Sequence, residues 1–338
     1  MLALGADLKN RFLFADGQRI HFGPDIGDLG DADNFDRLKK EIKKILARHK
    51  PHIIACDLHS GYFSTAFAKD ISLKLKAYAL KLIQHHHAHI ASVIFEHGLK
   101  KPAIGVSFDG TGLGADGKIW GGEFFIAHKK DFLRRAHLKY VKMPGGEKAI
   151  REPWRMLLSI MGKKGFPYVK SAAKKEKEAI LSLMSKDINS PLTSSAGRLF
   201  DAAAALIGLT ERVRHEAEGP MKLEAICDSG TNAFYEFGSG PEKVAYSIDT
   251  GPIFTGMARD LKKNAKKSLI SGKFHNSMAK IVIDTVKKLS RESGIKRAAL
   301  SGGVFQNAVL KKKAIAGLSK KGFRVFTNEK FPVNDFNI

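Results

Sequence analysis

The sequence predicts an α/β fold of two lobes with a cleft between them. An apolar strand that leads to an aspartate occurs twice, once before Asp7 and once before Asp109. An Ala-Asp-Gly turn and a returning strand follow in both places, with the turns at residues 15–17 and 115–117. Because two ordinary hairpins with a common turn sequence would have the same spacing, the repeat favours a duplicated unit without establishing one.

Strands and helices alternate in the first part of the chain. Short apolar runs predict strands, and an apolar period of 3.6 residues predicts helices. In the helix expected at 37–49, Leu38, Ile42, Ile45 and Leu46 form one apolar stripe while the lysines face away. In chain order we expect strands at 1–5, 11–15 and 18–22, a helix at 37–49, a strand at 52–58, a further helix and strand, a helix at 85–97, and strands at 103–108 and 118–126.

The second part begins with a mainly helical stretch at 155–226. We expect helices there at 154–161, 172–184 and 197–208, with a loop at 185–195. After a Gly/Ser/Asn-rich segment at 228–241 we expect helices at 256–269, 277–293 and 307–320, and strands at 297–300 and 323–327. The strand at 297–300, the glycines Gly302 and Gly303 and the helix after them form a layout typical of nucleotide-binding proteins.

Composition excludes several classes of protein. The chain has 338 residues and is 43% hydrophobic and 27% charged, which is the balance of a globular protein of roughly two domains. Two cysteines, Cys56 and Cys227, cannot build a disulfide framework. No apolar run approaches the roughly 20 residues of a membrane span, and the first residues do not resemble a signal peptide. We therefore expect a cytoplasmic protein with no membrane partner.

The chain is strongly basic, with 57 Lys and Arg against 34 Asp and Glu and a formal net charge of +23. The basic residues lie in many short runs, several of them on the polar side of predicted helices. This distribution favours solvated lysine-rich helix faces over a nucleic-acid surface, because no aromatic-rich binding motif accompanies the lysines. The charge alone leaves a nucleic-acid partner open.

The most informative segment is Gln84-His85-His86-His87-Ala88-His89. On a helix His85 and His89 are four residues apart, so both imidazoles project from one face and could share a metal ion. His86 and His89 form an alternative pair. A single such pair is more typical of surface histidines, and four histidines in an otherwise apolar run make the two interpretations about equal. Asp109, at the end of a strand, is a natural oxygen ligand or a turn-capping residue.

Three further segments could contact a phosphate. The loop Asp109-Gly110-Thr111-Gly112 offers backbone amides and a hydroxyl, although an ordinary glycine-rich turn has the same composition. Residues 144–155 place cations beside a Gly-Gly turn, and Arg198 and Asp201 lie one helical turn apart; both sets could equally be surface ion pairs. Cys56 is more readily a small buried strand residue than a nucleophile.

Taken in order, these segments resemble the C-terminal carbamoyltransferase region of the hydrogenase maturation factor HypF. The resemblance covers nearly the whole chain. It rests on 56–65, on the histidine segment 84–90, on Phe108-Asp-Gly-Thr-Gly112 with Ile119-Trp-Gly-Gly-Glu123, on 144–155, on Ser195-Ala-Gly-Arg-Leu-Phe-Asp201, and on Leu300-Ser-Gly-Gly-Val-Phe-Gln-Asn307. So many motifs in one order are highly specific.

The resemblance implies a fold and a set of site residues. The HypF region is similar to the TsaD/Kae family and belongs to the two-lobed, actin-like ASKHA folds. It implies duplicated β-hairpin/α/β lobes at 1–100, including the histidine helix, and at 101–338, with a helical insertion at about 150–226. It implies a divalent metal, iron or zinc, on His85, His89, Asp109 and Asp335. It also implies a nucleotide, ATP or carbamoyl-adenylate, that contacts Lys9, Gly110, Thr111, Gly112, Asp201, Gly302, Gly303 and Asn307.

The implied reaction is transfer of a carbamoyl group from carbamoyl-adenylate to the C-terminal cysteine thiolate of the partner HypE. The thiocarbamate formed is the precursor of the cyanide ligand of nickel–iron hydrogenase. A complete HypF also has acylphosphatase-like, zinc-finger and YrdC-like domains, none of which matches this sequence. We therefore expect a separate YrdC-like protein or domain to supply carbamoyl-adenylate. The family usually reads Asn-Asp-Gly-Gly-Ile where this chain has Asn334-Asp335-Phe336-Asn337-Ile338, which leaves the role of Asp335 open.

Other functions stay open at this point. They are a TsaD-like subunit that modifies tRNA, a small-molecule O-carbamoyltransferase, and a binding subunit without catalytic activity. Against the first, the TsaD histidine motif typically has Leu-Glu-Gly between its two ligands, whereas this chain has His86-His87-Ala88.

Overall fold

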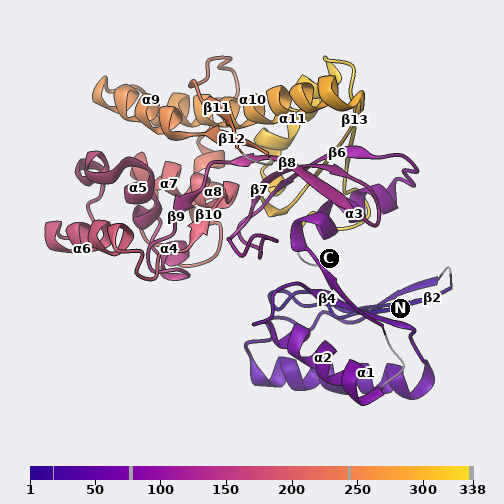
Figure 1. Ribbon diagram of the computed structural model, residues 1–338. Coiled ribbons are helices and arrows are strands. Elements are labelled where there is room, and N and C mark those ends of the chain that lie inside the picture. Colours follow the sequence, from indigo (N-terminus) through magenta and orange to yellow (C-terminus); the bar gives the residue numbers. More distant parts are fainter. Residues whose placement is uncertain (18, 76–78, 243–244, 335–338) are drawn as a thin grey trace.

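Two large β-sheets, one in each lobe, organise the chain in a computed structural model that describes residues 1–17, 19–75, 79–242 and 245–334 (Figure 1). The first sheet has the strand order β3-β2-β1-β4-β5. Strands β3, β2 and β1 are antiparallel, whereas β1, β4 and β5 are parallel. The strands are β1 (Leu2–Ala3), β2 (Leu13–Asp16), β3 (Arg19–Phe22), β4 (Ile53–Asp57) and β5 (Ala79–Ile83).

Helices α1 (Ala32–Arg48) and α2 (Phe63–Leu75) pack on this sheet in one hydrophobic core. The predicted stripe of α1 is confirmed, since Leu38 and Ile42 are fully buried. The helix begins before residue 37 because Asp31 caps it: its carboxylate accepts hydrogen bonds from the backbone N–H groups of Asp33 and Asn34.

The second sheet repeats this arrangement. Its order is β11-β12-β8-β7-β6-β13-β14, in which β8, β7 and β6 are antiparallel and β6, β13 and β14 are parallel. The hairpin β11-β12 extends it beside β8. The predicted duplication and two-lobed α/β fold are therefore confirmed. The strands are β6 (Ala103–Phe108), β7 (Gly122–Ala127), β8 (Phe132–Leu138), β11 (Gly238–Pro241), β12 (Tyr246–Asp249), β13 (Arg297–Ser301) and β14 (Arg324–Thr327).

The Ala-Asp-Gly turns, however, are not equivalent positions of the repeat. The first lies at the end of β2, before the third strand of its sheet, whereas the second lies in the loop between β6 and β7. There Gly114 and Gly117 close a tight turn of their own. The turn sequence recurs because Asp-Gly suits any tight turn. The predicted duplication is therefore correct, but the two Ala-Asp-Gly turns are not part of it.

The remaining helices cover the second sheet and form the helical insertion, with a small sheet of β9 (Val141–Lys142) and β10 (Leu192–Thr193) beside it (Figure 1). The helix predicted at 256–269 is wrong: α9 ends at Lys262, where Asn264 adopts a left-handed conformation, and α10 begins at Lys267. None of the helices in the described ranges is long and apolar enough to cross a membrane. The helices are α4 (Lys148–Arg151), α5 (Trp154–Met161), η1 (Gly162–Tyr168), α6 (Lys174–Ser185), α7 (Ala196–Leu206), α8 (Glu218–Ala225), α9 (Gly251–Lys262), α10 (Lys267–Ser293), η2 (Gly303–Gln306) and α11 (Ala308–Ser319).

The histidine helix α3 (His85–Glu96) packs on the second sheet. The sequence groups it with the first lobe, yet its packing partners are β6, β7, β13 and β14. Gly105 of β6 makes this contact close: a Cβ atom at that position would lie 2.8 Å from Cγ2 of Ile90. The absence of a side chain at residue 105 therefore sets the distance between α3 and β6.

We predict that Gly105→Val displaces α3 and lowers stability by about 1–3 kcal/mol, the usual cost of overpacking a core. The displacement would also separate the histidines of α3 from the end of β6, so affinity for Zn²⁺ should fall with the melting temperature. Thermal unfolding and a Zn²⁺ titration measure the two effects. Gly240→Val is the matched control, because a Cβ atom at that strand position would meet nothing within 4 Å. Equal melting temperatures for the two variants would contradict the prediction.

Candidate metal centre and the adjoining pocket

The four histidines of α3 are buried, with exposed fractions between 0 and 7%. Gln84 begins the helix as its N-cap, since its side-chain oxygen accepts a hydrogen bond from the N–H of His87. The histidines are therefore not the surface residues that a single His-x-x-x-His pair would suggest. Burying four imidazoles in an apolar helix requires a polar partner for each ring.

His85, His89 and Asp109 come together at the end of β6. Nε2 of His85 lies 3.2 Å, and Nε2 of His89 3.0 Å, from the same oxygen, Oδ2 of Asp109. The alternative pair is not assembled, because His86 turns toward Gln84 and Trp120. His87 lies against the carbonyl oxygen of His128 and stacks on Phe132. Of the four predicted metal ligands, Asp335 lies outside the described residues.

This arrangement fits a bound cation. Nδ1 of His85 lies 3.1 Å from Oδ2 of Asp57, and an ionised carboxylate can only accept a hydrogen bond. Nδ1 therefore directs its proton to Asp57, and Nε2, the other ring nitrogen, faces a second carboxylate, that of Asp109. Two acceptors face each other without repulsion only when a proton or a metal ion lies between them. Ligand atoms about 2.1 Å from a tetrahedral ion lie about 3.4 Å apart, close to the distances observed.

Asp109 is held firmly for such a role. Its Oδ1 accepts hydrogen bonds from the N–H groups of Gly110 at 2.8 Å and Gly303 at 3.1 Å, so Oδ2 is directed at the histidines. Burial by itself would raise the pKa of the Asp109 carboxyl group. The charges and hydrogen bonds of His89 and His85 outweigh burial and hold this pKa well below its ordinary value.

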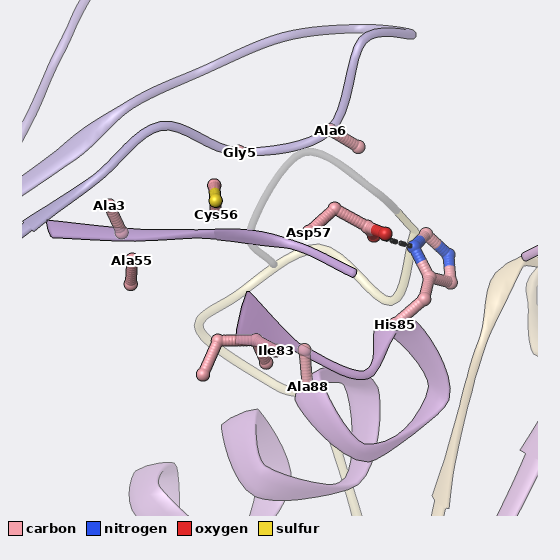
Figure 2. Close-up of a pocket in the computed structure, with 9 residues that line it drawn as sticks. All are labelled: Ala3, Gly5, Ala6, Ala55, Cys56, Asp57, Ile83, His85 and Ala88. Atoms are coloured by element: carbon pink, nitrogen blue, oxygen red, sulfur yellow. Dashed lines mark hydrogen bonds and ion pairs between the residues drawn. The ribbon is translucent and has the colours of Figure 1, made fainter. Parts of the chain in front are cut away.

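Asp57 was not predicted as part of this centre. It ends β4 of the first lobe and contacts His85 of α3 (Figure 2). Since His85 also contacts Asp109, one imidazole meets a carboxylate from each lobe. Beside it lies a small cavity of about 60 Å³ whose lining includes Cys56, Ala88 and Ile83 (Figure 2). Burial raises the pKa of the Cys56 thiol, which agrees with its predicted role as a small strand residue. The sequence does not predict the contact between Asp57 and His85, because the two residues belong to separate segments that pack in different lobes.

A larger cavity of about 410 Å³, here called the interlobe pocket, opens on the other side of Asp109. Five of the residues predicted to contact the nucleotide line it: Lys9, Gly110, Thr111, Gly303 and Asn307. Lys9 comes from the first lobe and forms an ion pair at 2.9 Å with Glu216 of the second lobe, which also lines the pocket. Cavities of this size are typical of small-molecule sites.

Three predicted nucleotide residues do not line the interlobe pocket. Gly112 packs beneath the imidazoles, where a Cβ atom would lie 2.5 Å from Cε1 of His86. Gly302 has a φ of 101° and touches the backbone of Phe108, so its role is in the turn. Asp201 is buried and pairs with Arg198 at 2.7 Å, and burial raises its pKa. Arg198, which the sequence left as a possible surface residue, is buried and lines the pocket.

Two backbone N–H groups of residues predicted to contact the nucleotide already have acceptors. The N–H groups of Gly110 and Gly303 bond to Asp109, so these glycines offer close approach rather than backbone donors. The N-terminus of α11, a predicted anion site, is also capped. Glu224 accepts hydrogen bonds from the N–H groups of Ala308 and Val309, and Asn307 accepts one from Leu310. Positive charge in the pocket therefore comes from side chains, those of Lys9 and Arg198.

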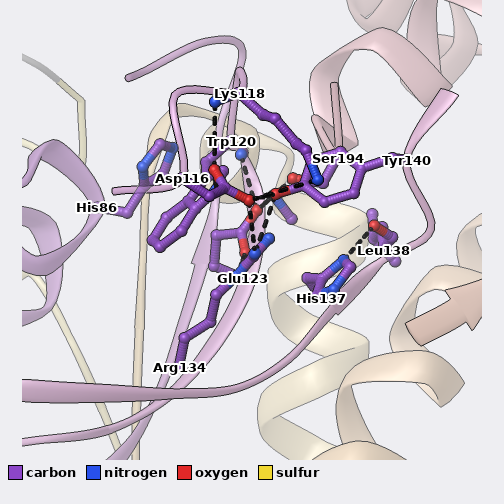
Figure 3. A network of polar contacts seen from close by, with 12 residues as sticks. His86, Asp116, Lys118, Trp120, Glu123, Arg134, His137, Leu138, Tyr140 and Ser194 are labelled. Atoms are coloured by element: carbon purple, nitrogen blue, oxygen red, sulfur yellow. Dashed lines mark hydrogen bonds and ion pairs between the residues drawn. The ribbon is translucent and has the colours of Figure 1, made fainter. Parts of the chain in front are cut away.

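Figure 3 shows a buried polar network around Glu123, and this network supports the backbone of Asp109. Glu123, fully buried on β7, accepts hydrogen bonds from the N–H groups of Gly121 and Gly122 and from Ser194 Oγ, and forms an ion pair with Arg134 at 2.6 Å. Gly121 in turn accepts the N–H of Asp109, and Ser195, the neighbour of Ser194, donates to the Asp109 carbonyl. One carboxylate thus fixes both segments that hold Asp109 in place.

We predict that Asp57→Asn weakens Zn²⁺ binding by roughly tenfold or more, the usual effect of removing a carboxylate behind a ligating histidine. The amide keeps the shape of the side chain but no longer compels Nδ1 of His85 to carry the proton. Competition with a chromophoric chelator measures the affinity. Asp70→Asn is the control, since Asp70 lies on α2 of the same lobe, exposed and paired with Lys74. Equal affinities of the two variants would show that Asp57 does not orient His85.

Comparisons with known proteins agree with this geometry. The family model described as the HypF Kae1-like domain matches residues 1–96, and the model described as Carbamoyltransferase, Kae1-like domain, second subdomain, matches residues 105–338. A HypF homolog from Cupriavidus necator is 33% identical over 96% of this chain and 85% of its own length. The HypF of Synechocystis is 32% identical over 99% of this chain, which spans 45% of that protein.

Two solved structures share the fold. Full-length HypF in the phosphate- and nucleotide-bound form has a TM-score of 0.93 and 38% identity, and the chain covers 44% of it. HypF of T. kodakarensis has a TM-score of 0.89 and 30% identity, with 46% of that chain covered. The two-lobed fold that the resemblance implied is confirmed. The chain spans less than half of these longer proteins, and it belongs to the HypF family of carbamoyltransferases, whose Kae1-like domain it contains.

Proposed function

We propose that this chain transfers a carbamoyl group from carbamoyl-adenylate to the C-terminal cysteine thiolate of HypE and releases AMP. The C–S bond of a thiocarbamate forms, and the bond between the carbamoyl carbon and the phosphate oxygen breaks. The observation that carries the proposal is the double role of Asp109. Its Oδ2 meets the two histidines, and the same residue lines the interlobe pocket.

The nucleotide belongs in the interlobe pocket. One similar solved HypF is in a phosphate- and nucleotide-bound form, and this pocket has the size for such a ligand. Arg198 and Lys9 supply positive charge beside Gly110 and Thr111, where the phosphate would lie. Arg198 is held by the buried carboxylate of Asp201, so its guanidinium is oriented before the ligand binds.

A divalent ion, iron or zinc, held by His85, His89 and Asp109, with Asp335 as the proposed fourth ligand, would polarise the carbamoyl carbonyl group. The chain itself needs no nucleophile, because the acceptor thiolate attacks and the adenylate leaves. The work of its residues is to position the two reactants and to stabilise the negative charge that the phosphate retains. A YrdC-like protein or domain would supply the carbamoyl-adenylate.

Intact mass measurement of HypE tests the proposal. HypE is incubated with this protein, a YrdC-like domain, ATP and carbamoyl phosphate, and we expect a carbamoyl adduct on its C-terminal cysteine. His85→Ala should abolish the adduct because it removes one of two imidazoles at the candidate centre. His87→Ala is the matched control, since His87 lies on the same helix but turns toward His128.

Formation of carbamoyl-adenylate is verified separately, so that a failed supply is not taken for a failed transfer. If carbamoyl-adenylate is present and HypE stays unmodified, the acceptor is wrong. Adducts of equal yield with His85→Ala and His87→Ala would contradict the role of the metal centre. Salt-sensitive binding of tRNA in place of HypE modification would favour the TsaD-like alternative.

A further inference from the structure

A histidine that the proposed reaction does not use lies beneath the interlobe pocket. His275 is in the middle of α10, is 0% exposed, and packs against the rings of Phe200 and Phe274. Its ring contacts Asn307, which lines the pocket. A fully buried imidazole is expected to have hydrogen-bond partners for its ring nitrogens.

The partners of His275 determine which nitrogen carries the proton. Nδ1 lies 2.9 Å from the carbonyl oxygen of Ser271, which can only accept a hydrogen bond, and 3.3 Å from Oγ of the same residue. Because this Oγ donates its own proton to the carbonyl oxygen of Leu223, the proton of the His275 ring is on Nδ1. Burial lowers the pKa of His275 to about 4, so the ring is neutral near pH 7. Nε2 therefore offers a lone pair, and it faces Nδ2 of Asn307 at 3.0 Å.

The amide of Asn307 is consequently held from both sides. Its Nδ2 donates to His275, and its Oδ1 accepts the N–H of Leu310 at 2.8 Å as the N-cap of α11. Exchanging the two amide atoms would place an acceptor against the lone pair of His275 and a donor against the N–H of Leu310. With one N–H used by His275, the second N–H of the amide is the donor that remains.

This end of the interlobe pocket suits an uncharged group. Glu224, which also lines the pocket, accepts the N–H groups of Ala308 at 2.6 Å and Val309 at 3.2 Å. Its carboxylate neutralises the N-terminus of α11 and would repel a phosphate. Arg198 lies beside Gly110, in the phosphate-binding part of the proposed site, and Lys9 is the second cationic residue in the lining of the pocket.

We propose that His275 is a positioning residue for the nucleotide: its neutral Nε2 holds the Asn307 amide so that the second N–H is directed to an acceptor atom of the nucleoside. The ligand chemistry at this point is a ring nitrogen of a purine or a ribose oxygen. The inference rests on the proposed function in one respect, namely that the interlobe pocket binds the nucleotide.

Calorimetric titration with AMP tests the inference on the purified chain. His275→Phe keeps a ring but removes the acceptor, and Asn307→Asp replaces the donor with an acceptor in a side chain of the same shape, which also keeps the N-cap of α11. Both variants should weaken AMP binding about five- to tenfold, the effect of one lost hydrogen bond to a buried group. His275→Gln, whose amide oxygen can accept from Asn307, should restore binding.

The double variant His275→Phe with Asn307→Asp should bind AMP no more weakly than Asn307→Asp alone, because both changes remove the same interaction. Affinity for Zn²⁺ should stay at the wild-type value in every variant, and affinity for inorganic phosphate should stay at the wild-type value in His275→Phe and His275→Gln, which a general loss of structure would not allow. Circular dichroism and thermal unfolding establish that each variant is folded.

The outcomes separate the inference from the proposed function. If the wild type binds AMP and a folded His275→Phe binds it equally well, His275 has no positioning role although the pocket assignment stands. If His275→Phe does not fold, normal AMP binding by Asn307→Asp overturns the inference. If the wild type itself fails to bind AMP, the assignment of the nucleotide to this pocket is wrong, and the inference falls with it.

Discussion

The buried negative charge of Asp109 is the constraint on which the rest of the site depends. A carboxylate with an exposed fraction of 6% is stable only when its charge is compensated, and here two imidazoles and two backbone N–H groups surround it. The histidines reach it because α3 lies close against β6 at Gly105. Its backbone N–H and carbonyl groups form hydrogen bonds with Gly121 and Ser195. Glu123 fixes both of these segments, because it accepts hydrogen bonds from the N–H of Gly121 and from Ser194. The packing of α3, the hydrogen bonds of the backbone and the charge of the imidazoles therefore all contribute to the position of Asp109.

Much of the fold could be predicted because its strands and helices have local patterns of apolar residues. The strand at 103–108 and the helix at 154–161 have the predicted bounds, since unbroken apolar runs and a clear apolar face define them. Strand β8 was missed because it contains the polar residues Arg134 and His137. In the fold Arg134 is half-buried and His137 is buried, and they pair with Glu123 and Glu242 of other segments. Hairpin β11-β12 was missed because its first strand is Gly-Ser-Gly-Pro, a sequence typical of loops.

In the candidate site, too, the residues set by a local pattern were predicted and those set by long-range contacts were not. Helical periodicity brought His85 and His89 to one face, and the structure adds Asp109 to them. Whether a glycine lines a pocket, by contrast, depends on what stands opposite it: Gly303 faces the interlobe pocket, whereas Gly112 and Gly302 face side chains and backbone. Asp57, Arg198 and His275 gain their roles from contacts between segments far apart in the chain, which no single stretch of sequence reveals.

His85 has a wider consequence because its two ring nitrogens face carboxylates of different lobes, Asp57 of the first and Asp109 of the second. Any hinge motion that separates the lobes must break one of these contacts. Binding of a cation at this centre and closure of the lobes would then be thermodynamically linked, and such linkage is reciprocal. A ligand that contacts both lobes, at Lys9 and at Arg198, would therefore strengthen cation binding, and the cation would strengthen binding of the ligand. The side chain of His85 thus connects the two lobes at the candidate metal centre.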